Sequence, residues 1–127
     1  MSGKRVWVVE DDADVLEVLR LRLIGWGAQV RGFGHVAGIR AALGEVEPAL
    51  PDLLLSDQRL PDGTGIEVAR LLRAASPALP VLLASGDTSP DDIARLRASG
   101  LPVLHKPFTS EELLSALSAL GLGDLRG

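Results

Sequence analysis

Four short apolar runs in this chain each end at polar or charged side chains that could do chemistry. The residues at these ends are Glu10, Asp11 and Asp12 after the first run, Asp57 after the second, Ser85 after the third and Lys106 after the fourth. If the runs are buried parallel strands of a doubly wound sheet, their carboxyl ends meet along one edge, where such folds bind ligands. Carboxylates gathered at one edge repel each other, which favours a hard cation such as Mg2+ among them and Lys106 facing an incoming anion. The residues outline a site that accepts a phosphoryl group.

The elements that would position these residues are short strands alternating with helical patterns. The strand-like runs are 5–10, 28–33, 52–56, 81–85 and 102–105. Between them apolar residues recur at helical spacing, and the last helix opens with the capping-box pattern from Thr109 to Glu112. Only the segment 35–47 is ambiguous, because its two glycines weaken the helix prediction. The pattern predicts an α/β fold, a doubly wound five-stranded parallel sheet with five helices on its two faces.

Size and composition limit the classes of protein to consider. With 127 residues, 46% of them hydrophobic, the chain fits one globular domain, which we place at 1–127 with a core at about 5–120 and a tail or linker at 121–127. The net charge of -4 gives little reason to expect direct contact with nucleic acid, and the absence of cysteine excludes disulfides and thiolate metal sites. No apolar stretch approaches the ~20 residues of a membrane span, so we expect a cytoplasmic domain without membrane contact.

The acidic residues also have a structural interpretation. Glu10, Asp11 and Asp12 could simply occupy the start of a helix, where carboxylates cap free donors and favour the dipole. Three consecutive acids exceed what capping needs, and Asp12 is the best candidate for the cap. Asp57 could belong to a turn, but the turn pattern 61–63 comes later. An ionised carboxylate can instead attack phosphorus to form an acyl phosphate, which favours Asp57 as a nucleophile.

The hydroxyl and the ammonium have ordinary alternatives as well. Most lysines are solvated surface residues, but Lys106 lies after an apolar strand and directly before Pro107, which favours a role in the site. Ser85 could be a common strand-end hydroxyl. Neither residue would indicate a function alone, so their interpretation depends on the acids at the neighbouring strand ends.

Four marks in one order resemble the receiver domain of two-component response regulators, over roughly residues 5–120. The marks are the segment 8–12, Asp57 with 60–63 close behind it, the pair 85–86 and the segment 106–108. The resemblance implies a flavodoxin-like fold with strand order 2-1-3-4-5. It also implies phosphoryl transfer to the domain from a phosphohistidine on a sensor histidine kinase or a histidine phosphotransfer protein, or from a small phosphodonor.

The resemblance assigns a role to each site residue. Asp57 is the phosphorylation site, and Mg2+ (or Mn2+) is held directly by Asp11 and Asp57, through water by Glu10, and by the backbone carbonyl of Arg59. Lys106 neutralises the phosphoryl oxygens, and its peptide bond to Pro107 is expected to be cis. Ser85 hydrogen-bonds the phosphoryl group and moves toward it. Catalysis of this kind requires mainly positioning and charge neutralisation.

Some positions depart from the common receiver pattern. Val103 stands where many receivers have Tyr or Phe, so an aromatic switch is not available and the usual dimerisation through the last two helices and strand is in doubt. The stretches 84–88 and 104–107 look more like receivers of hybrid sensor histidine kinases, with a stand-alone response regulator as the alternative. Arg59 and Asp87 take the rim positions that tune attack by water, and we expect their opposite charges to pair and to lengthen the life of the phosphoryl group.

Three other functions fit the residues less well. A haloacid-dehalogenase-like phosphohydrolase would carry a second Asp two residues after its nucleophile, where this chain has Arg59. A flavin-binding module needs a hydroxyl- and glycine-rich phosphate loop after the first strand, and the carboxylates there would repel phosphate. A pseudo-receiver that only binds a partner would be expected to lack a key acid or the lysine. We therefore expect no enzyme beyond a domain that catalyses its own phosphorylation and dephosphorylation.

Overall fold

The fold is known from a computed structural model, which describes residues 2–86 and 89–121. One parallel sheet has the order β2-β1-β3-β6-β7, which confirms the predicted order 2-1-3-4-5 once a small hairpin is left out of the count. Its strands are β1 (Arg5–Val9), β2 (Gln29–Phe33), β3 (Leu53–Asp57), β6 (Val81–Ser85) and β7 (Val103–His105). The hairpin pairs β4 (Arg59–Leu60) with β5 (Gly63–Thr64) and follows β3 directly.

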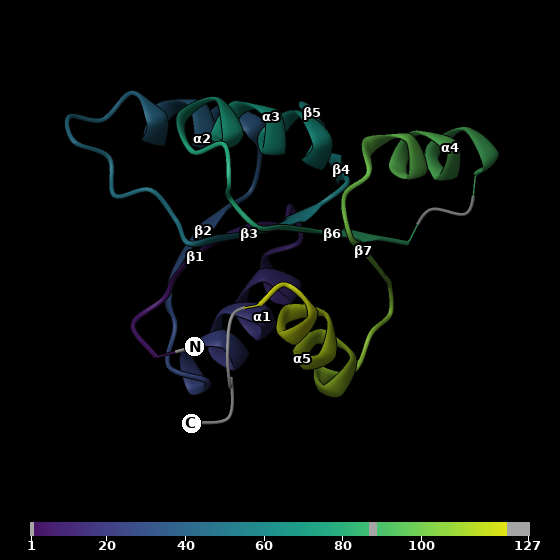
Figure 1. Cartoon of the computed structure of the whole chain (residues 1–127), viewed down its shortest axis with the longest axis horizontal. Helices are drawn as coiled ribbons and strands as arrows, with labels where there is room; N and C mark the ends of the chain where they lie inside the picture. The colour runs from purple at the N-terminus through teal and green to yellow at the C-terminus, as the bar shows by residue number, and fades with distance from the viewer. Residues whose placement is uncertain (1, 87–88, 122–127) are drawn as a thin grey trace.

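Within the described residues, five helices cover the two faces of the sheet, as predicted. They are α1 (Ala13–Gly25), α2 (Val36–Leu43), α3 (Gly65–Ala75), α4 (Pro90–Ser99) and α5 (Ser110–Ala119). Figure 1 shows α1 and α5 on one face and α2, α3 and α4 on the other, with α4 standing apart on the β7 side. No helix in the described part of the chain is long and apolar enough to cross a membrane.

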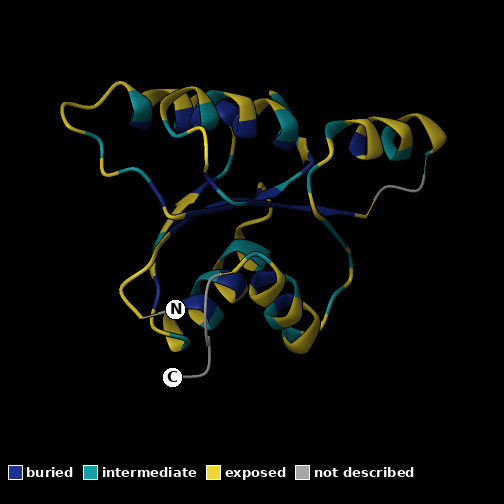
Figure 2. Ribbon diagram, in the orientation of Figure 1, coloured by how far each residue is buried: buried dark blue, intermediate teal, exposed yellow. Residues whose placement is uncertain are grey.

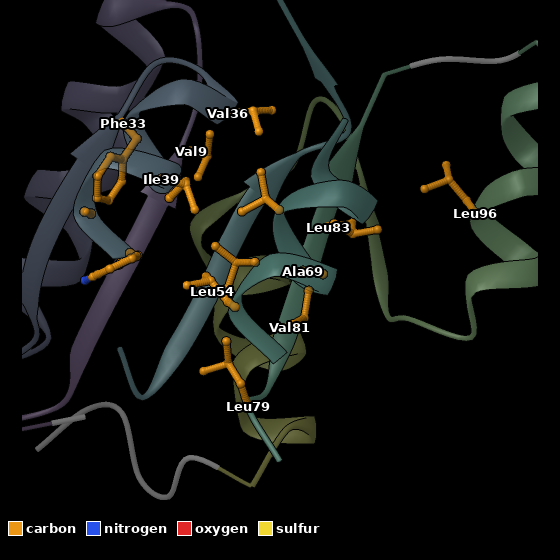
Figure 3. Packing of buried hydrophobic residues seen from close by; sticks show 14 residues of the cluster. Val9, Phe33, Val36, Ile39, Leu54, Ala69, Leu79, Val81, Leu83 and Leu96 are labelled. Atoms are coloured by element: carbon orange, nitrogen blue, oxygen red, sulfur yellow. The ribbon is translucent and has the colours of Figure 1, made fainter. Parts of the chain in front are cut away.

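Two hydrophobic clusters, one on each face, hold the helices to the sheet. Side chains alternate between the faces along each strand, so that Val6 and Val8 pack under α1 and α5 while Trp7 and Val9 belong to the opposite cluster. Central strands covered on both sides must be apolar at nearly every position, which explains the continuous runs in the sequence. Figure 2 shows the sheet as the most buried layer, and Figure 3 shows the cluster under α2 and α3.

Each helix begins at a side chain that accepts a backbone hydrogen bond from its first turn. These caps are Asp12, His35, Thr64, Ser89 and Thr109. The predicted capping roles of Asp12 and of the Thr109–Glu112 box are confirmed, because a carboxylate or hydroxyl oxygen there satisfies donors that lack a partner in the helix. The ambiguous segment forms the short helix α2, which ends at Leu43 and is capped by Gly44.

Two differences from the predicted elements concern the loop that follows β3. The strand includes Asp57 as its last residue, one position beyond the predicted end. The hairpin β4–β5 was not predicted, because only two residue pairs make it and its turn residues indicate no more than a bend. Of the predicted tail 121–127, residues 122–127 lie outside the described part of the chain.

Candidate functional site

Three carboxylates meet at the carboxyl edge of the sheet. Strands β1 and β3 pair in parallel with Val9 opposite Ser56, so the residues that follow them, Glu10 and Asp57, end up side by side. Together with Asp11 they offer one oxygen each, and these oxygens all lie within 4.8 Å of one another. Glu10 is buried, Asp11 is exposed and Asp57 is intermediate. The structure therefore brings together the acids that the sequence placed at two separate strand ends.

Lys106 lies against two of these acids. Its Nζ donates to Glu10 Oε2 at 2.7 Å and to Asp57 Oδ2 at 3.1 Å. Its backbone N–H donates to the carbonyl of Ser85 at 2.9 Å, which ties the lysine to the end of β6. The peptide bond from Lys106 to Pro107 is cis, as the resemblance implied.

Burial and charge act against each other in this cluster. Burial raises the pKa of Glu10 above its ordinary value, and the hydrogen bond from Lys106 only partly opposes the shift. Burial alone would lower the pKa of Lys106, but its contacts with Glu10 and Asp57 outweigh burial and hold the pKa above its usual value. The lysine therefore stays charged beside an excess of carboxylates, and the cluster has a net attraction for a further cation.

The donor set fits Mg2+. This ion binds oxygen ligands at 2.0–2.1 Å in octahedral geometry and usually takes one or two carboxylates. The three acids offer oxygens that lie within 4.8 Å of one another, so they can supply one or two direct ligands, with a further carboxylate acting through a bound water. Asp12 points elsewhere, because its carboxylate caps α1.

The structure describes two of the three remaining predicted residues, Ser85 and Arg59. Ser85 is buried at the end of β6, directly after the residue that pairs with Asp57. Arg59 is exposed, and its guanidinium donates to Asp92 of α4 at 3.0 Å. Asp87 lies outside the described residues. Sequence reasoning missed Asp92: the pattern from Ser89 to Asp92 signals a helix start, but nothing local shows that this start faces Arg59.

The loop that carries Arg59 is fixed by contacts that the sequence did not reveal. A Cβ on Gly65 would lie 2.6 Å from the carbonyl oxygen of Asp57, so only glycine lets α3 begin this close to the end of β3. The buried Gln58 accepts a hydrogen bond from the backbone of Ile66 at 3.1 Å. At the hairpin turn, Asp62 accepts two backbone hydrogen bonds from the first residues of α2. Asp57 thus sits on a well-anchored strand end.

Comparison with known proteins gives consistent matches. A family model for the response regulator receiver domain matches residues 6–118. The chain is 36% identical over 118 residues to the probable transcriptional regulatory protein TcrX of Mycobacterium tuberculosis, covering 91% of this chain and 48% of that protein. It is 31% identical over 118 residues to the DNA-binding transcriptional regulator NtrC of Proteus hauseri, covering 92% and 24%. The solved non-phosphorylated HemR receiver domain from Leptospira biflexa matches with a TM-score of 0.75 and 28% identity, covering 93% of this chain and 94% of that one.

The matches cover different shares of the known proteins, and they include the candidate site. The chain spans about half or less of the length of the two curated relatives, yet nearly all of the solved receiver domain. The matched region includes both strand ends that carry the acids and the loop that carries Lys106. The chain belongs to the response regulator receiver domain family.

Proposed function

We propose that this receiver takes a phosphoryl group from a phosphohistidine onto Asp57, with Mg2+ bound beside it. The single observation that carries this proposal is the position of the Asp57 carboxylate, which lies in one cluster with Glu10 and Asp11 and accepts a hydrogen bond from Lys106 at 3.1 Å. A carboxylate at a strand end, between a cation site and a fixed ammonium, is placed to attack an anionic phosphorus centre.

The transfer can be written from the residues of this chain. An oxygen of Asp57 forms a bond to phosphorus while the bond from phosphorus to the imidazole nitrogen breaks, and the electron pair leaves with that nitrogen. When bound, Mg2+ would neutralise charge on the phosphoryl oxygens, and Asp11, Asp57 and the carbonyl of Arg59 would hold it directly, with Glu10 acting through water. Lys106 supplies a second positive charge, and Ser85 supplies a hydroxyl donor.

The surface beside Lys106 suits a protein as phosphodonor. A groove of about 500 Å3 runs between α1 and the loop after β7, and Lys106 itself lines it together with mainly apolar residues. The adjoining face of α1 exposes Val18, Leu21 and Ile24, which are 48%, 55% and 43% exposed. Exposed apolar side chains beside a groove are typical of surfaces that bind another protein. Because this surface continues from the phosphoacceptor cluster, it supports docking of a phosphohistidine-bearing protein, a sensor kinase or a phosphotransfer protein.

This receiver resembles domains of two kinds of protein, hybrid sensor histidine kinases and response regulators. The resemblance of residues 84–88 and 104–107 to hybrid sensor histidine kinases favours that origin, whereas the curated relatives above are named as transcriptional regulators. We propose a response regulator as the better supported source. The DNA binding named for such relatives belongs to those whole proteins, and we still expect no direct contact of these 127 residues with nucleic acid, since they carry a net charge of -4.

The test uses a small phosphodonor so that no partner has to be known. The protein is incubated with Mg2+ and acetyl phosphate, and intact mass reports the addition of one phosphoryl group. We expect Asp57→Asn to abolish the addition and Glu111→Gln, a change at an exposed acid in the first turn of α5, to leave it intact. Equal phosphorylation of Asp57→Asn and the wild-type protein would refute the assignment.

A further inference from the structure

Helix α4 has little apolar anchoring. Of its ten residues, all of which the structure describes, Leu96 alone is buried. Helix α3, of similar length, buries Val68, Ala69 and Leu72 together with its first glycine. Figure 3 shows Leu96 set apart from the other labelled residues of the cluster, and Figure 1 shows α4 away from α2 and α3. A helix with so little buried surface depends more than its neighbours on polar contacts for its position.

One such contact joins α4 to the loop after the phosphoacceptor strand. The guanidinium of Arg59 lies 3.0 Å from a carboxylate oxygen of Asp92, which stands in the first turn of α4. The Asp92 side chain is only 15% exposed, while that of Arg59 is 72% exposed. Asp92 is also 3.7 Å from Arg95, but that pair lies within the helix. The Arg59–Asp92 pair therefore links α4 to another element, whereas the Arg95–Asp92 pair does not.

Arg59 is two residues from Asp57, so its guanidinium can interact electrostatically with a phosphoryl group there. The two residues flank Gln58, which is buried, while Arg59 reaches solvent and Asp57 is partly exposed. A phosphoryl group on the carboxyl carries about 1.5 to 2 negative charges in place of the single charge of the free carboxylate, and it offers three acceptor oxygens. The planar guanidinium of arginine binds such oxygens in pairs. A phosphoryl group on Asp57 thus competes with Asp92 for the same guanidinium.

We propose that Arg59 and Asp92 form an electrostatic latch that holds α4 against the phosphoacceptor loop, and that phosphorylation of Asp57 opens it by drawing Arg59 to the phosphoryl group. This inference rests on the proposed function. Asp92 keeps Arg95 when the latch opens, so its charge is not left alone, and α4 is then held mainly through Leu96. By linkage, a partner that binds the released form of α4 favours the phosphorylated protein. The latch would let phosphorylation of Asp57 change the position of α4 in a chain that has Val103 in place of the aromatic switch residue.

The experiment measures hydrogen exchange of the α4 amides in the full chain. Each protein is compared without ligand and with Mg2+ plus beryllofluoride, a stable mimic of a carboxyl-bound phosphoryl group, and fluorine NMR reports whether Asp57 is occupied. In the wild type we expect occupancy to raise exchange in α4 by roughly 1.5- to 5-fold, the range that an exposed ion pair can supply. Asp92→Asn should show the raised exchange without ligand and little further rise with it.

Two matched variants separate the latch from a general loss of charge. Asp91→Asn removes an exposed acid from the same first turn, and Arg95→Ala removes the partner of Asp92 within the helix. Both should behave like the wild type. Arg59→Gln breaks the latch from the other side and should match Asp92→Asn in the ligand-free protein.

The outcomes distinguish the latch from the proposed function. Unliganded Asp92→Asn with wild-type exchange in α4 would overturn the latch, as would a wild type whose Asp57 is occupied while α4 exchange stays the same. Asp91→Asn with exchange raised as much as Asp92→Asn would also overturn it, because the effect would then come from the helix start itself. Absence of any bound beryllofluoride signal would instead overturn the proposed phosphoacceptor function.

Discussion

The ammonium of Lys106 lies 2.7 Å from a carboxylate oxygen of Glu10. Lys106 follows β7 and Glu10 follows β1, and β3 and β6 lie between these two strands in the sheet. The pair therefore crosses the carboxyl edge of the sheet above β3, the strand that carries Asp57. The Glu10 side chain is 4% exposed and that of Lys106 is 25% exposed. The acid thus fixes the lysine in place before any phosphoryl group arrives.

Loss of this pair should lower stability. Lys106→Met leaves the buried carboxylate of Glu10 without its ammonium, and we expect the free energy of unfolding in urea at neutral pH, with metal chelated, to fall by about 1–3 kcal/mol. In a Glu10→Gln background the same change should cost clearly less, because no unpaired charge remains. Lys4→Met, at an exposed position, serves as the control. Strictly additive effects in this double-mutant cycle would show that the two side chains do not support each other.

A second prediction concerns Mg2+ binding and Asp11. Asp11 is exposed at the edge of the acid cluster, so Asp11→Asn should leave the fold intact and, by removing repulsion, should if anything raise the melting temperature of the metal-free protein. The rise in melting temperature that Mg2+ produces should disappear, together with phosphorylation. At a hundred times the dissociation constant that rise corresponds to about 2.7 kcal/mol. Asp14→Asn, which changes an acid of the first turn of α1, is the matched control. A metal-induced rise that survives in Asp11→Asn would contradict the assignment.

Asp62 makes the stability depend on pH in a defined direction. Hydrogen bonds from the backbone of Val36 and Ala37, at 2.7 and 2.9 Å, hold the pKa of Asp62 below its ordinary value of 3.8. A carboxyl whose pKa is lowered by folding stabilises the folded state above its unfolded pKa, and this contribution is lost as the pH falls through the folded value. Asp62→Ala should lower the melting temperature by a few degrees at neutral pH, and the difference should shrink below about pH 4.

Melting temperatures of both proteins between about pH 6 and about pH 3 check this prediction. Glu111→Ala, which removes an exposed acid from the first turn of α5, provides a control with no tie to the hairpin. A difference between wild type and Asp62→Ala that stays constant across the range would show that the carboxylate charge does not matter there.

The parts of the site that could be predicted are those fixed by the topology. Parallel strands must end at the same edge, so a residue that follows a buried run, such as Asp57 or Lys106, is placed by the run itself. Helix starts are equally local, because Asp12 and Thr109 satisfy donors only two or three residues away. Both kinds of inference depend on a short window of sequence.

Contacts between loops could not be predicted in this way. Asp62 caps a helix that begins 26 residues earlier, and Arg59 meets an acid 33 residues further along. Neither pair has a repeating spacing or a pattern of apolar residues to reveal it. Both depend on the hairpin after β3, whose path is set by close contacts such as that of Gly65 with the end of the strand. Through these contacts the loop that follows Asp57 is joined to α2 and α4.

The last prediction concerns how long a phosphoryl group survives on Asp57. From the resemblance to receivers we expect Arg59 and Asp87 to take the rim positions of the site. Their side chains should then pair over the phosphoryl group and block the in-line path of water. An exposed pair of this kind contributes only ~0.2–1 kcal/mol to stability, which is too little to affect folding but enough to restrict access. Arg59→Ala and Asp87→Ala should each shorten the half-life of the phosphorylated protein. The double variant should be no faster than the faster single variant, because either change opens the same path.

Asp92 separates this gate from the latch on α4. Arg59 donates to Asp92 at 3.0 Å, and Asp92→Asn weakens this competing contact while both gate residues keep their side chains. The half-life of Asp92→Asn should therefore equal or exceed that of the wild type, although its α4 is released. Half-lives measured by phosphorus NMR in Mg2+ distinguish the possibilities. Arg59 and Asp87 do not act as one gate if the two single variants have the half-life of the wild type, or if the effects of the two changes multiply in the double variant. A shortened half-life in Asp92→Asn would show that Asp92 itself shields the phosphoryl group.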